Sequence, residues 1–222
     1  MKSGGQKKEQ DMKKRKILTS MILVGTFSLF MLSATWGATI SAIYQQSYEE
    51  EARGKYQEAI LVLMQANQAG DNSYLYHLRL GWLQYLATKY PDSVNSYRKA
   101  ALLNKDSIEA KLGLMLPLMA QGRWSDAEKV GKEILSLDKL SYLANSRLAY
   151  IYYNLKQYKD AEVYYRNVLL YYPGDIEMKV GLAWSLLKQD KKEESEKVFS
   201  EILRYVPNHI SANTGMKIVK GK

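Results

Sequence analysis

The stretch LAYIYYNLKQYKDAEVYYRNVLLYYP, residues 148–173, decides the fold because it contains two consecutive helical faces. The first face consists of Leu148, Ala149 and Tyr152, and the second consists of Tyr158, Ala161, Tyr165 and Val168. Because Ala149 and Ala161 are small, two antiparallel helices can approach closely, and the larger side chains around them fill the seam. The stretch therefore predicts a packed pair of helices that ends at Pro173.

This pattern recurs at one constant interval along the chain, and no insertion is needed between Gly54 and Pro207. The aromatic residue that opens the second helix occurs as Tyr56, Tyr90, Trp124 and Tyr158. The small residue of the second helix occurs as Ala59, Ser93, Ala127 and Ala161, and that of the first as Gly81, Ala149 and Ala183. The late aromatic residue occurs as Tyr97, Tyr165 and Phe199. The third repeat departs most, because Met115 replaces the small residue and Gly131 replaces the aromatic one.

Together, these positions resemble the tetratricopeptide repeat, a helix-turn-helix unit of about 34 residues. The resemblance implies an all-α fold: a right-handed superhelical solenoid of about five such repeats with a C-terminal capping helix. We place the repeat domain at residues 41–222, with repeats at about 41–73, 74–107, 108–141, 142–174 and 175–208, and the cap at 209–222. Residues 1–40 precede it as a basic region followed by a targeting segment.

Composition excludes several classes of function. The 222 residues contain no cysteine, which excludes disulfides, thiol catalysis and cysteine-ligated metals. The net charge of +9 is concentrated at the N-terminus, where residues 1–16 carry seven Lys or Arg and two Asp or Glu. The rest of the chain is mixed in sign and has no basic block with interleaved aromatic residues, so we expect no nucleic-acid binding.

The N-terminal segment supports two interpretations. Residues 17–48 contain no charged side chain, and residues 17–32 are strongly apolar. As a signal peptide, the segment would be cleaved near residues 34–38 and would release a soluble protein. As a retained anchor, residues 17–43 exceed the roughly 20 residues that a transmembrane helix needs. Both interpretations place the repeats on the exported, periplasmic or extracytoplasmic, side of a cell envelope.

The motifs of enzymes are missing from the sequence. The two histidines, His77 and His209, do not form an HExxH pattern, and no G-x-S-x-G elbow or glycine-rich phosphate loop occurs. We interpret His77 as a packing residue and His209 as a surface or capping residue. We therefore expect no enzyme activity, no metal site and no cofactor.

A binding surface is implied by the resemblance, because the first helix of each repeat lines a concave groove in this family. The inward positions of this chain are Tyr48, Arg79, Trp82, Tyr85, Leu116, Met119, Arg147, Tyr150, Tyr153, Asn154, Trp184 and Lys188. Aromatic side chains supply apolar contact at a low cost in rotamer entropy, and arginines supply forked donors. We expect an aromatic and mildly basic groove for an extended peptide or a helix of a protein partner.

Two further comparisons narrow the expected ligand. Family members that bind chaperone tails use a clamp of basic and asparagine side chains, but Leu75, Glu109, Leu143 and Glu177 occupy the matching positions here. That activity is therefore excluded, and we expect a scaffold or adaptor for envelope assembly or secretion. The alternative is a glycan-binding module for polysaccharide export, in which the rings stack on sugars. Polar neighbours would favour sugar, whereas Leu116 and Met119 favour peptide.

Overall fold

The computed structural model describes residues 39–221, all of them in helices or in the short connections between helices. The predicted signal peptide or anchor lies outside the described residues, apart from its last few positions. Within residues 39–221, no helix has both the length and the apolar character needed to cross a membrane. The chain divides into two compact units between Asp71 and Asn72.

In the described part of the first unit, one pair of helices spans residues 39–52 and α2 (Tyr56–Gln68). The hydroxyl of Ser47 is buried between the two helices and donates a hydrogen bond to the carbonyl of Ala59 at 3.0 Å. The Tyr44 hydroxyl donates to the Asp71 carboxylate at 2.7 Å. These two hydrogen bonds join the first helix to α2 and to the residues that follow α2.

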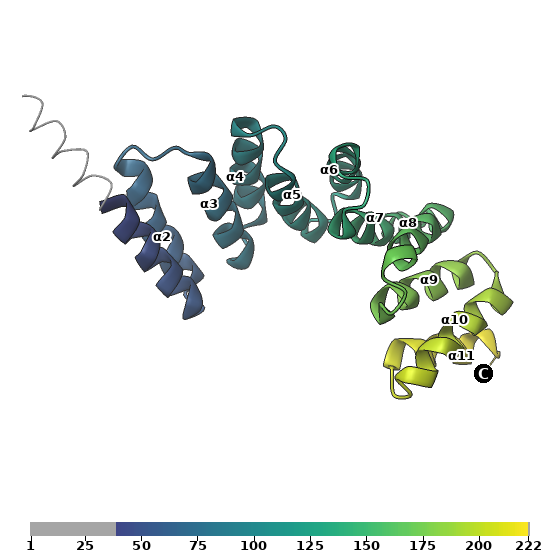
Figure 1. Cartoon of the computed structure of the whole chain (residues 1–222). Coiled ribbons are helices and arrows are strands. Elements are labelled where there is room, and N and C mark those ends of the chain that lie inside the picture. The colour runs from purple at the N-terminus through teal and green to yellow at the C-terminus, as the bar shows by residue number, and fades with distance from the viewer. Residues whose placement is uncertain (1–38, 222) are drawn as a thin grey trace, which may run out of the picture. The chain divides into compact units, whose positions relative to one another are not determined.

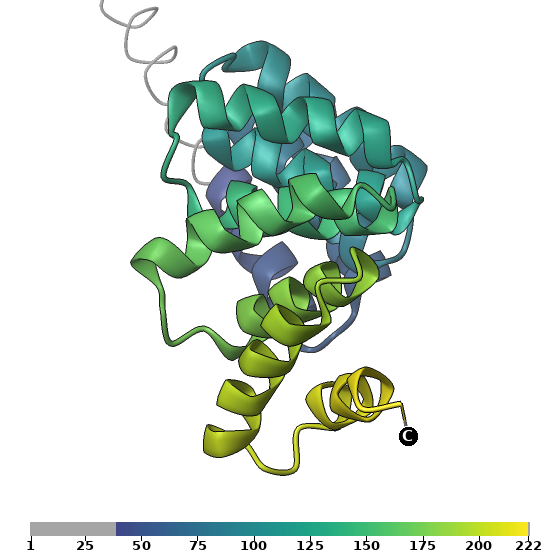
Figure 2. The same ribbon diagram turned by 90° about the vertical axis from the view of Figure 1, so that its right-hand side faces the viewer.

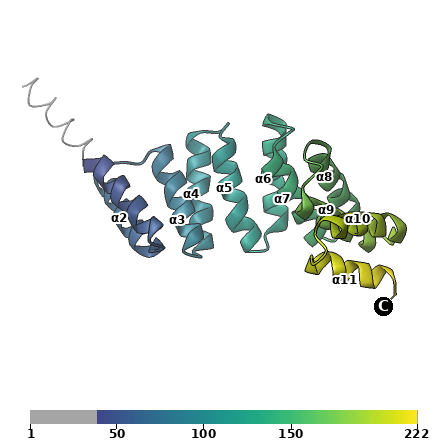
Figure 3. The same cartoon turned by 60° about the horizontal axis from the view of Figure 1, so that its bottom comes forward.

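The second unit contains four helix pairs and a final single helix. The pairs are α3 (Tyr74–Leu86) with α4 (Tyr90–Leu103), α5 (Ile108–Ala120) with α6 (Trp124–Leu137), α7 (Tyr142–Asn154) with α8 (Tyr158–Tyr171), and α9 (Ile176–Lys188) with α10 (Lys192–Tyr205). The last helix is α11 (Ile210–Val219). Figure 1 shows the helices of this unit following one another in chain order, and Figure 3 shows α3 to α7 side by side. Figure 2 shows α11, in yellow, at the C-terminal end.

The first helix of each pair, called the A helix here, belongs to the inner layer of this unit. Successive A helices contact one another, since α3 contacts α5, α5 contacts α7, α7 contacts α9 and α9 contacts α11. In the described chain, no comparable contact joins one second helix, or B helix, to the next. Helices crowd on the inside of a curved stack and separate on its outside. The A helices therefore line the inner side, and we call their face directed away from the B helices the A-helix surface.

Local sequence signals set both ends of each pair. Every A helix of the second unit begins after a side chain that accepts a hydrogen bond from a backbone amide three residues later, and these caps are Ser73, Ser107, Ser141, Asp175 and His209. Such caps satisfy amides that the first helical turn leaves unpaired. Each turn into a B helix contains one residue with positive φ, and these are Gly54, Thr88, Gly122, Lys156 and Asp190. Both sets recur at the same interval as the core pattern, so the repeat is defined by its caps and turns as well as by its core.

Small residues lie where the two helices of a pair pack against each other. The Ser93 hydroxyl donates to the carbonyl of Gly81 at 2.7 Å, and the Ser195 hydroxyl makes the same bond to Ala183 at 2.9 Å. The third pair of the array differs, because Met115 occupies the small position. A Cβ added at Gly131 would lie 3.1 Å from the Met115 methyl carbon, so a small residue in α6 accommodates a large one in α5. The predicted all-α stack of about five helix pairs with a C-terminal cap is confirmed.

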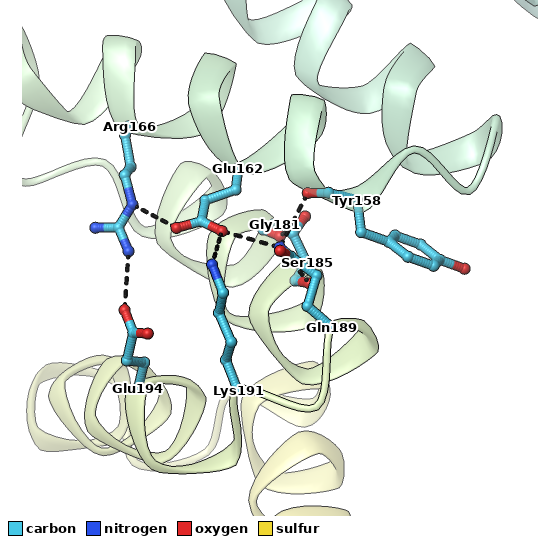
Figure 4. Close-up of polar contacts among 8 residues, drawn as sticks. All are labelled: Tyr158, Glu162, Arg166, Gly181, Ser185, Gln189, Lys191 and Glu194. Carbon is cyan, nitrogen blue, oxygen red and sulfur yellow. Dashed lines mark hydrogen bonds and ion pairs between the residues drawn. The ribbon is translucent and has the colours of Figure 1, made fainter.

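A partly buried carboxylate joins the fourth and fifth pairs of the array (Figure 4). Glu162 of α8 accepts hydrogen bonds from Lys191 at 2.8 Å, from Gln189 at 2.9 Å and from Arg166 at 2.9 Å. Arg166 also donates a hydrogen bond to the Glu194 carboxylate at 3.2 Å. Burial alone would raise the pKa of Glu162, but these donors stabilise the anion and hold the pKa below its usual value.

Candidate functional site

The central row of the A-helix surface consists of one residue from each A helix, taken at the interval of the repeat: Trp82, Leu116, Tyr150, Trp184 and Ile218. Trp82 is 37% exposed and Tyr150 is 49% exposed, which is high for residues of this size. Leu116 and Trp184 are half-buried. Tyr48 is also exposed, but it belongs to the first unit and is not placed relative to this row.

A second row lies one turn further along the A helices and supports the first. Tyr85, Met119 and Tyr153 are half-buried. The rings of Trp82 and Tyr85 stack with their centres 5.9 Å apart, and Tyr153 meets Tyr158 edge to face at 5.4 Å. The exposed Tyr150 ring meets Trp124 edge to face with centres 6.0 Å apart. Ring contacts of this kind restrict side-chain motion, so Trp82 and Tyr150 are held in place before any ligand arrives. The ends of α7 and α9 add the exposed Asn154 and Lys188.

Trp184 has a structural role that the spacing alone does not reveal. Its ring meets Phe199 edge to face with centres 5.6 Å apart, and its Nε1–H donates to the Ser211 hydroxyl at 2.8 Å. These contacts connect α9 to both α10 and α11. Trp184 therefore holds the cap against the last pair, while Trp82 and Tyr150 expose more of their rings.

The two arginines differ from the sequence expectation of a mildly basic groove. Arg79 is only 4% exposed, so its charge is not accessible on the A-helix surface. Arg147 is half-buried, and its Nη1–H donates to the backbone carbonyl of Leu112 at 2.5 Å. Burial lowers the pKa of the Arg147 guanidinium, an effect that the nearby Tyr85 and Tyr97 oppose. The Arg147 side chain thus joins α7 to α5.

Two acidic side chains are accessible on the A-helix surface, in the positions that exclude a basic clamp. Leu75, Glu109, Leu143 and Glu177 stand at the second position of α3, α5, α7 and α9, and all four are exposed. We call these residues the Leu/Glu row. In the sequence, these residues exclude a basic clamp, and their regular spacing, equal to the repeat interval, already indicates that they form one row.

The A helices also carry partly buried apolar side chains. Leu78, Leu112, Leu116 and Met119 lie on the same helices, and all four are half-buried. Within residues 39–221, no group of three His, Asp or Glu side chains is placed to hold a metal ion. His77 is buried, with Nε2 at 2.6 Å from the Asn72 side-chain oxygen, and His209 caps α11 by accepting from the Ala212 amide at 3.2 Å. The capping role predicted for His209 is confirmed.

Comparison with known proteins agrees with this architecture. The family model described as "Tetratricopeptide repeat" matches residues 155–214. No curated protein sequence matched the chain. Among solved structures, a tetratricopeptide repeat protein from Parabacteroides merdae ATCC 43184 superimposes with a TM-score of 0.77 at 18% identity, covering 83% of this chain and 75% of that one.

Two further structures show the same fold. MamA, residues 41 to the end, from Desulfovibrio magneticus RS-1 has a TM-score of 0.72 at 14% identity, covering 78% of this chain and 97% of that one. A chain of the APC/C hetero-tetramer Cut9–Hcn1 has a TM-score of 0.64 at 18% identity, covering 80% of this chain and 36% of that one. The chain therefore has the fold of the tetratricopeptide repeat proteins, and residues 155–214 match the tetratricopeptide repeat model by sequence.

Proposed function

We propose that this chain is an exported or membrane-anchored scaffold that binds a peptide or a helix of a protein partner on its A-helix surface, in envelope assembly or secretion. The observation that carries the proposal is the exposure of Trp82 and Tyr150 on successive inner helices. Exposed aromatic rings with restricted rotamers are typical of the centres of protein interfaces.

The chemistry beside the rings favours protein over sugar. Sugar-binding sites surround each stacking ring with polar partners for hydroxyl groups, but α5, the helix between those of Trp82 and Tyr150, carries Leu116 at the equivalent position and Met119 one turn further along. Apolar walls contribute binding energy by removing apolar surface from water. The Cut9–Hcn1 structure adds an example of this fold in a protein assembly. Glycan binding in polysaccharide export is the second candidate, supported by the same exposed rings.

The export part of the proposal is supported by the sequence of the N-terminal segment, in which basic residues precede an apolar run. The measurement that tests it is the N-terminus and mass of the protein after cell fractionation. An N-terminus near residues 34–38 in a soluble envelope fraction would indicate a diffusing adaptor. An intact chain in the membrane fraction would indicate a tethered one, and an intact chain in the cytosol would contradict export.

Site-specific crosslinking tests the binding surface, because a chain without cysteine allows a single reactive thiol to be introduced. We would place cysteine at Tyr150, and as a control at Leu102, which lies exposed on the B helix α4. The expected result is a defined protein adduct from position 150 that position 102 does not give.

Alanine variants then show whether the rings carry the binding. Trp82→Ala with Tyr150→Ala should abolish an adduct formed from a third cysteine on the same surface, at Asn154, with little change in melting temperature. Loss of stability with an unchanged adduct would mean that the rings are core residues and that the proposed surface is wrong. An adduct that polysaccharide displaces and peptides do not would favour the glycan alternative.

A further inference from the structure

The Leu/Glu row has a regular alternation that neither the fold nor the central row requires. Its members follow the order leucine, glutamate, leucine, glutamate from α3 to α9. Leu75 is 50% exposed and Leu143 is 44% exposed, so both leucines offer apolar surface. The Glu177 side chain is 76% exposed.

The two carboxylates are accessible for a cation. Glu109 accepts a hydrogen bond from the Tyr74 hydroxyl at 3.0 Å, which orients the carboxylate and leaves it further acceptor positions. Glu177 has the His209 Nε2 atom at 3.5 Å on one oxygen. Each glutamate also lies in the first turn of its helix, where the helix dipole favours a negative charge.

The two arginines one helical turn after the leucines do not present an accessible charge beside the row. Arg79 is buried, and Arg147 donates to a backbone carbonyl. Lys188 is exposed, but it stands eleven residues after Glu177 in the same helix, which corresponds to about 16 Å along the helix axis. The row therefore presents two negative charges and two apolar side chains on one side of the A-helix surface.

The spacing of the row fits an extended chain. Packed helices have axes about 8–10 Å apart, and an extended peptide advances about 3.3 Å per residue. A segment that runs across the A helices would thus place every third residue opposite a member of the row. It would meet leucine, glutamate, leucine and glutamate in turn.

We infer that the Leu/Glu row binds an extended segment of a protein partner in which apolar and cationic side chains alternate at every third residue, in the pattern apolar-x-x-Lys/Arg-x-x-apolar-x-x-Lys/Arg. This inference rests on the proposed function, because it specifies the chemistry of the partner on the same surface. The leucines bury the apolar positions of the segment, and the glutamates pair with its cations. Opposite charges at matching positions select a partner more strongly than they add affinity.

The probe is a fluorescein-labelled peptide of ten residues with Leu, Lys, Leu and Lys at positions 1, 4, 7 and 10 and serine or glutamine between them. Anisotropy titrations with the full chain would compare it with a peptide that has Glu in place of Lys, and with one in which the same residues are four apart. The lysine peptide at spacing three should bind at least about tenfold more tightly than either control. Its affinity should also fall as salt is added.

Variants of the row complete the test. Glu109→Gln with Glu177→Gln should weaken binding of the lysine peptide about fivefold to tenfold and reduce its salt dependence. The matched control is Glu133→Gln with Glu193→Gln, two exposed glutamates on the B helices α6 and α10, and it should change neither. An equal affinity of the lysine and glutamate peptides, no effect of the row variants, or no binding of the lysine peptide at about 1 mM would each overturn the inference.

Failure of the inference about the Leu/Glu row can be distinguished from failure of the proposed function. If both peptides bind equally and Trp82→Ala abolishes both, the surface binds peptides and only the charge pattern is wrong. Suppose that no peptide binds, but crosslinking at Tyr150 captures a partner and Trp82→Ala abolishes this capture. The proposed function then stands without the Leu/Glu row. If no peptide binds and crosslinking at Tyr150 captures no partner that depends on Trp82, the proposed function itself is rejected.

Discussion

The ring of Tyr97 lies where a side chain at Gly113 would begin: a Cβ atom added at Gly113 would be 2.1 Å from Tyr97 Cε1. The two residues are sixteen apart, one in the B helix α4 and the other in the following A helix α5. The same relationship occurs between Tyr165 and Gly181, at 2.2 Å, and between Phe199 and Gly215, at 2.1 Å. The late aromatic residue of each of these pairs thus packs against the backbone of the next A helix.

Gly113→Ala should therefore destabilise the protein, although alanine favours helix. A methyl group gains about 1 kcal/mol in helix propensity, but here it would overlap a ring that is only 3% exposed and cannot move aside. We expect a net loss of about 1–3 kcal/mol in the free energy of unfolding, measured by urea denaturation.

Two variants control for this result. At Gly174, no atom lies within 4 Å of an added Cβ. Gly174→Ala should therefore leave the free energy of unfolding within about 0.5 kcal/mol of the wild type. Tyr97→Leu is destabilising by itself, but in combination with Gly113→Ala the losses should be less than additive. Strict additivity would show that the ring and the glycine are not coupled.

The repeat length could be predicted from the sequence because large and small residues at the helix seam recur at fixed positions, as Tyr158 and Ala161 illustrate. The direction of a long side chain could not. Arg147 occupies the position that is glycine at 113 and 181, and it turns to the Leu112 carbonyl because Gly131 provides no ring against it. Such choices depend on two neighbouring repeats at once. Comparing equivalent positions of the repeats therefore predicts which residues form one row on the surface. It does not predict which of those residues are accessible.

Met115 and Gly131 should behave as a coupled pair. Gly131→Ala would place a Cβ 2.8 Å from Leu148 and 3.1 Å from Met115, so it should cost about 1–3 kcal/mol through overpacking. Met115→Ala should cost about 2–5 kcal/mol, because the methionine is fully buried and leaves a cavity. The double variant should be more stable than the sum of the two losses predicts. Chemical denaturation of all four proteins measures this coupling, and a coupling near zero would contradict the packing described here.

Thr88→Gly should stabilise the protein. Thr88 has φ of 60°, in the left-handed region that β-branched residues avoid, and the equivalent positions 54 and 122 are glycine. Removing this strain should raise the free energy of unfolding by about 1 kcal/mol. The reverse change, Gly122→Thr, should lower it by a similar amount. Melting temperatures of the two variants check the prediction, and a destabilised Thr88→Gly would mean that the threonine side chain makes a compensating contact.

Glu162→Gln should lower stability at neutral pH and lose its effect in acid. Hydrogen bonds from Lys191, Gln189 and Arg166 hold the pKa of Glu162 below its usual value, so the ionised carboxylate stabilises the fold at neutral pH. The contribution disappears as the pH falls through the lowered pKa. We expect a loss of about 1–2 kcal/mol at pH 7 that shrinks towards zero as the pH falls below the lowered pKa. Urea denaturation as a function of pH measures it, with Glu193→Gln as the exposed control, and a pH-independent difference would reject the ionic explanation.

Trp184 and Tyr150 stand at equivalent positions of successive A helices, but their alanine variants should have opposite consequences. Trp184→Ala removes the ring contact with Phe199 and the hydrogen bond to Ser211, and it should cost about 2–4 kcal/mol.

Tyr150→Ala removes a ring that is half exposed, and it should cost less than about 1 kcal/mol while weakening partner binding. Thermal unfolding followed by circular dichroism separates the two variants. Ser211→Ala isolates the hydrogen bond and should account for only about 1 kcal/mol of the Trp184 effect. If Tyr150→Ala were as destabilising as Trp184→Ala, the central row would be part of the core along its whole length, and a ligand surface there would be ruled out.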